Sequence, residues 1–144
     1  TSFESNNIEL ERNYQFNEYI YVYSTEIQQV ILNILKNAED VLTDKDSFNR
    51  KIKIKTYEKD NFATIEIIDN GGGISNEIIN NIFDPYFSTK KAKEGSGLGL
   101  YMSKTIINEH CQGYLAAHNS EFGATFKIKL PINNNDGEIN NAIS

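Results

Sequence analysis

Three glycines follow an acidic residue in the stretch Asp69-Asn70-Gly71-Gly72-Gly73-Ile74. The preceding run, residues 62–68, is mostly apolar and rich in β-branched side chains, so this stretch stands where a predicted strand ends. Glycine adopts positive φ angles and lets a ligand approach the main chain closely, which suits a binding turn. A simple tight turn explains the stretch equally well on its own. Its meaning therefore depends on the other motifs.

The composition indicates one globular domain with room for a hydrophobic core. The chain has 144 residues, of which 39% are hydrophobic, and a net charge of −6. Its fourteen basic residues are scattered, which argues against nucleic acid as a partner. The single cysteine, Cys111, excludes an internal disulfide and a cysteine-based zinc site, and it fits a reducing compartment. No apolar run of membrane-spanning length and no signal-peptide pattern is present, so we expect no membrane contact by this domain.

A strongly amphipathic helix is predicted over residues 25–43. Ser24 or Thr25 can cap it, with Gln28 in capping-box spacing from Thr25. One helical face carries the apolar residues Ile27, Val30, Ile31, Ile34, Leu35, Ala38, Val41 and Leu42.

Asn33 and Asn37 lie one turn apart at the border of that apolar face. Asparagine is a poor helix former because its amide competes with the backbone, so the pair calls for an explanation. The two amides can simply solvate the margin of the helix. Alternatively, their oxygens serve a hard cation such as Mg²⁺, which prefers oxygen ligands.

Strands are predicted on both sides of this helix. Residues 8–11 form one, and residues 19–23 form either a second strand or an extended approach to the helix. Residues 51–57 and 62–68 form a hairpin through a turn at 58–61.

Helices and strands are also predicted in the second half of the chain. Ser75 or Asn76 can cap a short helix that contains Ile78, Ile79 and Ile82. Another helix runs to about His110, followed by two closing strands at residues 114–117 and 124–130. The polar tail, residues 132–144, is expected to be disordered.

Two further motifs are Phe83-Asp84-Pro85-Tyr86-Phe87 and Gly95-Ser96-Gly97-Leu98-Gly99-Leu100. The aromatic motif can simply plug the edge of the core. Glycines at the start of a helix expose backbone N–H groups to an anion, as in phosphate sites. Their spacing fits neither a P-loop nor a dinucleotide-binding fingerprint, and a flexible hinge is a comparable explanation for them alone.

The order of the motifs carries more information than any one of them. It resembles the N, first glycine, F, second glycine and final GxT boxes of the histidine-kinase-like (Bergerat-fold, GHKL) ATPases. The matching boxes are Asn33-xxx-Asn37-Ala38, Asp69-x-Gly71-x-Gly73, Phe83-x-Pro85-x-Phe87, Gly95-x-Gly97-x-Gly99 and Gly123-x-Thr125. The chain looks most like the catalytic ATP-binding domain of a bacterial sensor histidine kinase, over roughly residues 6–131.

This resemblance implies the α+β class and a two-layer α/β sandwich. The sheet would be mixed and mostly antiparallel, with about three helices on one face and ATP held between the helices under a mobile lid, residues 88–97. Residues 1–131 would form the catalytic domain and residues 132–144 the tail. Because the chain begins with Thr1, we expect it to be a fragment of a longer protein.

The resemblance also implies roles at the base. Asp69 would accept a hydrogen bond from the adenine amino group. Gly71 and Gly73 would let the base and sugar approach, and Ile74 would contact the adenine edge. Thr125 would help to fix Asp69 or the base.

At the phosphates, Asn37 would coordinate Mg²⁺ and Asn33 would support it, which makes these two the implied catalytic and metal-binding residues. The N–H groups of the second glycine box would face the phosphates. The ATP-binding set is completed by Phe83, Lys90, Gly95, Gly97, Leu98 and Gly99.

Position 33 favours transfer over hydrolysis. Hydrolytic relatives (gyrase, mismatch-repair and heat-shock chaperone ATPases) carry a glutamate there that resembles a general base for water. The amide of Asn33 cannot accept a proton, so efficient hydrolysis is not expected.

Two residues depart from the common kinase pattern. Many sensor kinases have a lysine at the position of Asp40 and an aromatic residue at that of Val41. We expect Asp40 to point away from the phosphates or to reach Mg²⁺ through water. Lys90 or Lys91, with Lys90 the better candidate, would supply the missing positive charge.

Neither His110 nor His118 fits a phosphoacceptor, since each has the setting of a structural residue. The implied function is to bind Mg-ATP and to donate its γ-phosphate to a histidine on a separate dimerisation domain, with a response regulator as an indirect partner. A cytoplasmic location is expected, in a parent protein that can be membrane-anchored. The alternatives are a stand-alone GHKL-type kinase or ATPase, and a degenerate, non-enzymatic interaction module.

Overall fold

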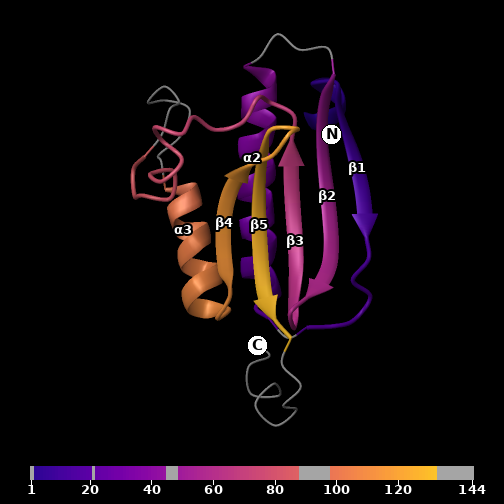
Figure 1. The fold of residues 1–144 in the computed structure, drawn as a ribbon, viewed down its shortest axis with the longest axis vertical. Helices are drawn as coiled ribbons and strands as arrows, with labels where there is room; N and C mark the ends of the chain where they lie inside the picture. The colour runs from indigo at the N-terminus through magenta and orange to yellow at the C-terminus, as the bar shows by residue number, and fades with distance from the viewer. Residues whose placement is uncertain (1, 21, 45–48, 88–97, 133–144) are drawn as a thin grey trace.

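The computed structural model describes residues 2–20, 22–44, 49–87 and 98–132 (Figure 1). Its five strands form one sheet in the order β1-β2-β3-β5-β4. β1 and β2 are parallel, and the other neighbours are antiparallel. The strands are β1 (Ile8–Tyr14), β2 (Arg50–Lys59), β3 (Phe62–Asp69), β4 (Tyr114–Asn119) and β5 (Ala124–Pro131). The predicted mixed, mostly antiparallel sheet is therefore confirmed.

The described residues contain three α-helices: α1 (Ser2–Ser5), α2 (Ser24–Thr43) and α3 (Gly99–Thr105), the last continuing as the π-helical turn η2 (Ile106–His110). In Figure 1, α2 runs behind the sheet and α3 stands beside its β4 edge. α2 packs on β3, α3 and η2. These layers match the predicted two-layer α/β sandwich.

Strand alternation divides the sheet into a face that packs on α2 and an open face. Residues on the packed face, such as Ile52, Ile67 and Ile128, are almost completely buried. The helix contributes most of the predicted apolar stripe, with Val30 and Ile34 fully buried. The outermost member of that stripe, Val41, is 38% exposed at the rim.

The start of α2 differs from the prediction. Tyr23 is its N-cap residue, with an extended backbone (ψ 95°) and no capping side-chain hydrogen bond. Ser24 and Thr25 lie inside the first turn, so the predicted caps are wrong. The described residues between 19 and 23 form no strand, which favours the extended approach to the helix.

The short helix predicted after the glycines is also wrong. Residues 76–86 form successive turns, in which Asn81 N–H donates to Ile78 O and Asp84 N–H donates to Asn81 O. Asparagines disfavour a helix here, and Pro85 has no N–H to continue one. Ser75 still caps the first turn, because its Oγ accepts from Glu77 N–H at 3.2 Å.

The predicted hairpin is confirmed, and its turn is tight. Asp60 and Asn61 have φ angles of 53° and 66°, as a two-residue type I′ turn requires. Ile132 N–H donates to Asn61 O at 3.0 Å, which ties the residue after β5 to this turn. The rest of the predicted tail, residues 133–144, and the predicted lid, residues 88–97, lie outside the described residues.

Replacing Asn61 with alanine is expected to lower the free energy of unfolding by about 1 kcal/mol, because a Cβ without a local hydrogen-bonding group is strained at positive φ. Asn61→Gly is expected to stay within about 0.5 kcal/mol of wild type, since glycine adopts this conformation freely. Urea unfolding monitored by circular dichroism measures both. Equal losses in the two variants would contradict the turn geometry.

Candidate functional site

A buried carboxylate ends β3. Asp69 is 4% exposed and pairs across the sheet with the fully buried Ile52, so its side chain lies on the α2 face. Its Oδ1 accepts a hydrogen bond from Gly71 N–H at 2.9 Å. A carboxylate is therefore held at the end of a core strand, within the layer between sheet and helix.

Two glycines pack closely around this carboxylate. A Cβ on Gly71 would lie 2.5 Å from Val41 Cγ1, so the loop after β3 touches α2. A Cβ on Gly123 would lie 2.3 Å from Asp69 O, so the β4–β5 turn touches the loop from the other side. Distances below about 3 Å leave no room for a methyl group. Gly71 thus leaves room for the Val41 and Asp69 side chains, and Gly123 is required for the close approach of two main chains beside Asp69.

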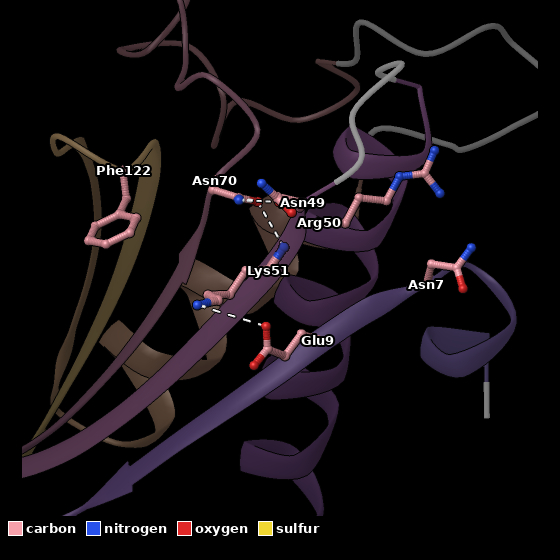
Figure 2. Close-up of a pocket in the computed structure, with 7 residues that line it drawn as sticks. All are labelled: Asn7, Glu9, Asn49, Arg50, Lys51, Asn70 and Phe122. Carbon is pink, nitrogen blue, oxygen red and sulfur yellow. Dashed lines mark hydrogen bonds and ion pairs between the residues drawn. The ribbon is translucent and has the colours of Figure 1, made fainter.

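Asn70 fastens the same loop to β2 (Figure 2). Its Oδ1 accepts from Lys51 N–H at 2.8 Å, its Nδ2 donates to Asn49 O, and its own N–H donates to Lys51 O at 3.2 Å. Both the oxygen and the nitrogen of this amide bond to main-chain groups, which fixes the chain at the end of β3, before the glycines begin.

The pocket drawn in Figure 2 is a separate feature, with a volume of about 480 Å³. Lys51, which lines it, alternates with Ile52 along β2, and Ile52 shares a face with Asp69, so the pocket opens on the face of the sheet away from Asp69. Lys51 Nζ is also paired with Glu9 at 3.8 Å. Asn70 also bonds to Lys51 N–H and Asn49 O within this lining, and the pocket is not part of the site around Asp69.

One stripe of α2 connects the Asp69 loop with the start of α3. Asn33, Asn37 and Val41 follow at i, i+4 and i+8, and therefore share one side of the helix. Val41 meets Gly71 at one end, and Asn33 Cγ lies 4.0 Å from a Cβ position on Gly99 at the other. The helical rise separates the two ends by about 12 Å, and the half-buried Asn37 lies midway.

Asn33 joins the two helices. Its Nδ2 donates to Ser103 Oγ of α3 at 3.2 Å, and its Oδ1 accepts from Gln29 Nε2 at 3.2 Å. Both ends of the amide are engaged in protein contacts, so this residue is suited to supporting Asn37 rather than to offering its own oxygen. Ser103 is fully buried and gave no indication of this contact in the sequence.

A metal ion at this stripe would depend on amide and ligand oxygens. No group of three or more histidine, cysteine, aspartate or glutamate residues that could hold a metal occurs among the described residues. Mg²⁺ binds through few protein ligands and completes its shell with water and phosphate oxygens. The donor set around Asn37 is compatible with that mode of binding, which needs a phosphate-bearing ligand.

Asp40 is paired on its own helix. Its Oδ1 lies 3.3 Å from Lys36 Nζ, and Glu39 Oε1 lies 3.4 Å from the same nitrogen. Hydrogen bonding and charge attraction from Asp40, followed by those from Glu39, raise the pKa of Lys36. The negative charge of Asp40 is therefore balanced by Lys36 one turn away.

The F-box aromatic packs into the core edge. Phe83 is half-buried and stacks edge-to-face on Phe126 at 6.2 Å between ring centroids. Lys104 Nζ lies 4.7 Å from the centre of the same ring. Ile74 also packs against the core cluster. Both residues thus anchor the segment after the glycines, and the contacts of Phe83 fit the plugging role considered for it.

Thr125 makes no direct side-chain contact with Asp69, so any help in fixing Asp69 or the base would have to be indirect, for example through water. Thr125 pairs with Ile68, and alternation places both on the face of the sheet away from Asp69. Its Oγ1 is buried without a hydrogen-bond partner in the described part of the chain. Ala124, one residue earlier, lies on the same face of the sheet as the Asp69 side chain.

A residue that the sequence analysis missed closes the loop. Asn119, at the end of β4, makes two hydrogen bonds with the main chain of Ile74.

At the other end of the site, Leu98 is the N-cap residue of α3 and Gly99 its first residue, and no side chain caps this terminus. The predicted site residues Lys90, Gly95 and Gly97 lie outside the described residues.

His110 has a structural contact. Its Nδ1 lies 2.7 Å from Glu26 Oε2, which connects the end of η2 with the first turn of α2. His118 is exposed on β4, opposite Thr125. The contact of His110 fits the structural role predicted for it.

The comparison with protein families decides the identity. Residues 23–134 match the model of the histidine kinase-, DNA gyrase B- and HSP90-like ATPases. The chain belongs to this family. No helix in the described ranges is long and apolar enough to cross a membrane.

Relatives of this ATPase domain are sensor kinases. It is 44% identical over 108 residues to the signal transduction histidine-protein kinase AtoS of Escherichia coli (strain K12), a match that covers 74% of this chain and 17% of AtoS. The chain thus spans about a sixth of that relative's length. The predicted resemblance to sensor histidine kinases is confirmed.

Solved structures of histidine kinases share this fold. The catalytic domain of histidine kinase ThkA superposes with a TM-score of 0.77 at 27% identity, covering 90% of this chain and 82% of that one. ThkA in complex with response regulator protein TrrA matches with a TM-score of 0.74 at 25% identity, covering 92% of this chain and 36% of that one. The fold is that of a histidine kinase catalytic domain.

Proposed function

We propose that this ATPase domain, residues 1–131, binds Mg-ATP and donates the γ-phosphate to a histidine on a separate dimerisation domain of its parent kinase. The observation that carries the proposal is the stripe Asn33, Asn37 and Val41. It links a buried carboxylate loop to the start of α3 over about 12 Å, a span suited to a nucleotide with its base at one end and its phosphates at the other.

The base end is built around Asp69. Its carboxylate accepts the adenine amino hydrogen, while Gly71 and Gly73 let the base lie against the main chain. Ile74 contacts the adenine edge. Burial makes the carboxylate a strong and selective acceptor, because an analogue without a donor at that place leaves a buried charge unpaired.

At the phosphate end, Asn37 holds the Mg²⁺–phosphate unit and Asn33 keeps Asn37 in register with α3. Bound Mg²⁺ would neutralise the charge of the phosphate oxygens. The N–H groups of Leu98 and Gly99 face the phosphates at an uncapped helix start. Gly95, Gly97 and Lys90 of the lid complete this end.

Transfer is favoured over hydrolysis by the chemistry of Asn33. Phosphoryl transfer depends mainly on positioning and charge neutralisation, so one domain can supply ATP while another supplies the nucleophile. A neutral imidazole nitrogen already offers a lone pair, whereas water needs a base that the amide of Asn33 cannot provide.

The partners follow from this division of labour. The acceptor histidine is proposed to belong to another domain, because His110 contacts Glu26 and His118 is a strand residue of the sheet. The solved complex of ThkA with TrrA supports a response regulator as the next protein in the relay. We place this domain in the cytoplasm.

Asn37→Ala is expected to remove the Mg²⁺-dependent part of ATP affinity while leaving Mg²⁺-independent binding nearly unchanged, because the lost amide serves the phosphate end only. The effect is roughly tenfold in Kd with Mg²⁺. Calorimetric titration with and without Mg²⁺ measures it. Asn13→Ala, on the distant strand β1, is the matched control; an unchanged Mg²⁺ effect in Asn37→Ala would remove this residue from the metal site.

Phosphotransfer tests the function itself. The domain is mixed with radiolabelled ATP, Mg²⁺ and the dimerisation domain of the parent kinase, and label is expected on a histidine of that domain. Steady phosphate release by the isolated domain, lost in Asn37→Ala, would instead show a hydrolytic ATPase. Absence of nucleotide binding would show an interaction module.

A further inference from the structure

Asn119 holds the loop after β3 by imitating a neighbouring strand. Its Oδ1 accepts from Ile74 N–H at 2.7 Å, and its Nδ2 donates to Ile74 O at 2.7 Å. One side chain thus satisfies both main-chain groups of a residue 45 positions away, in the donor and acceptor pattern of a strand pair.

Besides the packing of the Ile74 side chain on the core, few contacts hold the main chain of the loop at this point. Gly72 and Gly73 have φ angles of 95° and 88°, so the chain has left the sheet geometry. In the described part of the chain, the two bonds from Asn119 are the hydrogen bonds made by the main chain of Ile74. Flanking bonds hold Gly71 to Asp69 and start a turn at Ser75.

Gly73 makes this clamp possible. A Cβ on Gly73 would lie 2.8 Å from Asn119 Oδ1, so a larger residue would push the amide away. The glycine of the first glycine box thus serves the clamp as well as the approach of a ligand. The Asp69 side of the loop has hydrogen bonds of its own, from Gly71 N–H to Asp69 Oδ1 and from Lys51 N–H to Asn70 Oδ1, and neither of these involves Asn119.

We infer that Asn119 is a positioning residue for the adenine site, acting through the Ile74 main chain to hold the Gly73–Ile74 side of the loop against the base. The inference rests on the proposed binding of ATP. Asn119 touches no nucleotide in this arrangement. Replacing Asn119 leaves Asp69 in place but releases the main chain on the Gly73–Ile74 side of the adenine site.

Two variants separate the clamp from general stability. Asn119→Ala removes both hydrogen bonds, and Asn119→Asp keeps the shape and the acceptor but loses the donor and places a negative oxygen at the Ile74 carbonyl. Both are expected to lower ATP affinity, about tenfold for the alanine variant, at a temperature where circular dichroism shows each variant fully folded. Asn61→Gly is the control, because it removes a similar amide-to-carbonyl bond, from Asn61 Nδ2 to Ile132 O at 3.3 Å, at the far end of the sheet.

Amide hydrogen exchange gives a second readout. Ile74 N–H is expected to be protected in wild type and to exchange rapidly in Asn119→Ala, while the amides of β3 and β5 keep their protection. Wild-type affinity in both Asn119 variants, with Ile74 exposed to exchange, overturns the positioning role. Failure of wild type to bind ATP overturns the proposed function instead, and the inference with it.

Discussion

Asp69→Asn is expected to abolish measurable ATP binding without unfolding the domain. The new amide can still accept from Gly71 N–H through its oxygen, so the loop bond at 2.9 Å survives. Its NH₂ group, however, meets the adenine amino group as a second donor. Loss of a charged acceptor and an unsatisfied buried donor together weaken binding by about 3 kcal/mol, or more than a hundredfold.

Calorimetric titration of ATP into the variant measures this loss, and thermal melting checks the fold. Asp60→Asn is the matched control, because it makes the same acid-to-amide change in the hairpin turn, where asparagine tolerates the φ of 53°. ATP affinity in Asp69→Asn equal to that of Asp60→Asn would show that the carboxylate is not the adenine acceptor.

Gly123→Ala is expected to damage both stability and binding. The added methyl group would lie 2.3 Å from Asp69 O, 3.2 Å from Gly71 N and 3.3 Å from Asn70 Cα. These are main-chain atoms that cannot rotate away, so the loop and Asp69 must shift. Overpacking and backbone strain of this kind lower the free energy of unfolding by about 3 kcal/mol, and the displaced carboxylate weakens ATP binding at least tenfold.

Gly113→Ala provides the comparison. Its methyl group would lie 2.1 Å from Lys129 O, an equally severe clash at the opposite end of β4 and β5. Urea unfolding is expected to show similar destabilisation in the two variants, while titration of the folded protein shows reduced ATP affinity only in Gly123→Ala. An equal loss of ATP affinity in both variants would mean that the effect comes from general destabilisation of the sheet.

The elements with local periodicity were predictable from the sequence. The apolar stripe of α2 and the alternation in β2 and β3 are patterns that repeat within a few residues and indicate which side chains are buried. All three elements formed as expected. The short helix after the glycines failed because asparagines and Pro85 favour turns, which apolar spacing alone does not reveal.

Contacts between distant segments were not predictable in the same way. Whether Thr125 faces Asp69 depends on the register of β5 against β3, and a shift of one residue moves a side chain to the other face. The partners of Asn33 and Ile74 lie 70 and 45 residues away. No local pattern marks Ser103 or Asn119 for these contacts.

The most direct test of the account is calorimetric titration of ATP and ADP into the wild-type domain, with and without Mg²⁺. We expect both nucleotides to bind in the micromolar range, about −6 to −8 kcal/mol, and Mg²⁺ to strengthen the binding of ATP. If neither nucleotide binds under either condition, the five motifs mark only the fold in this chain, and the proposed kinase function is contradicted.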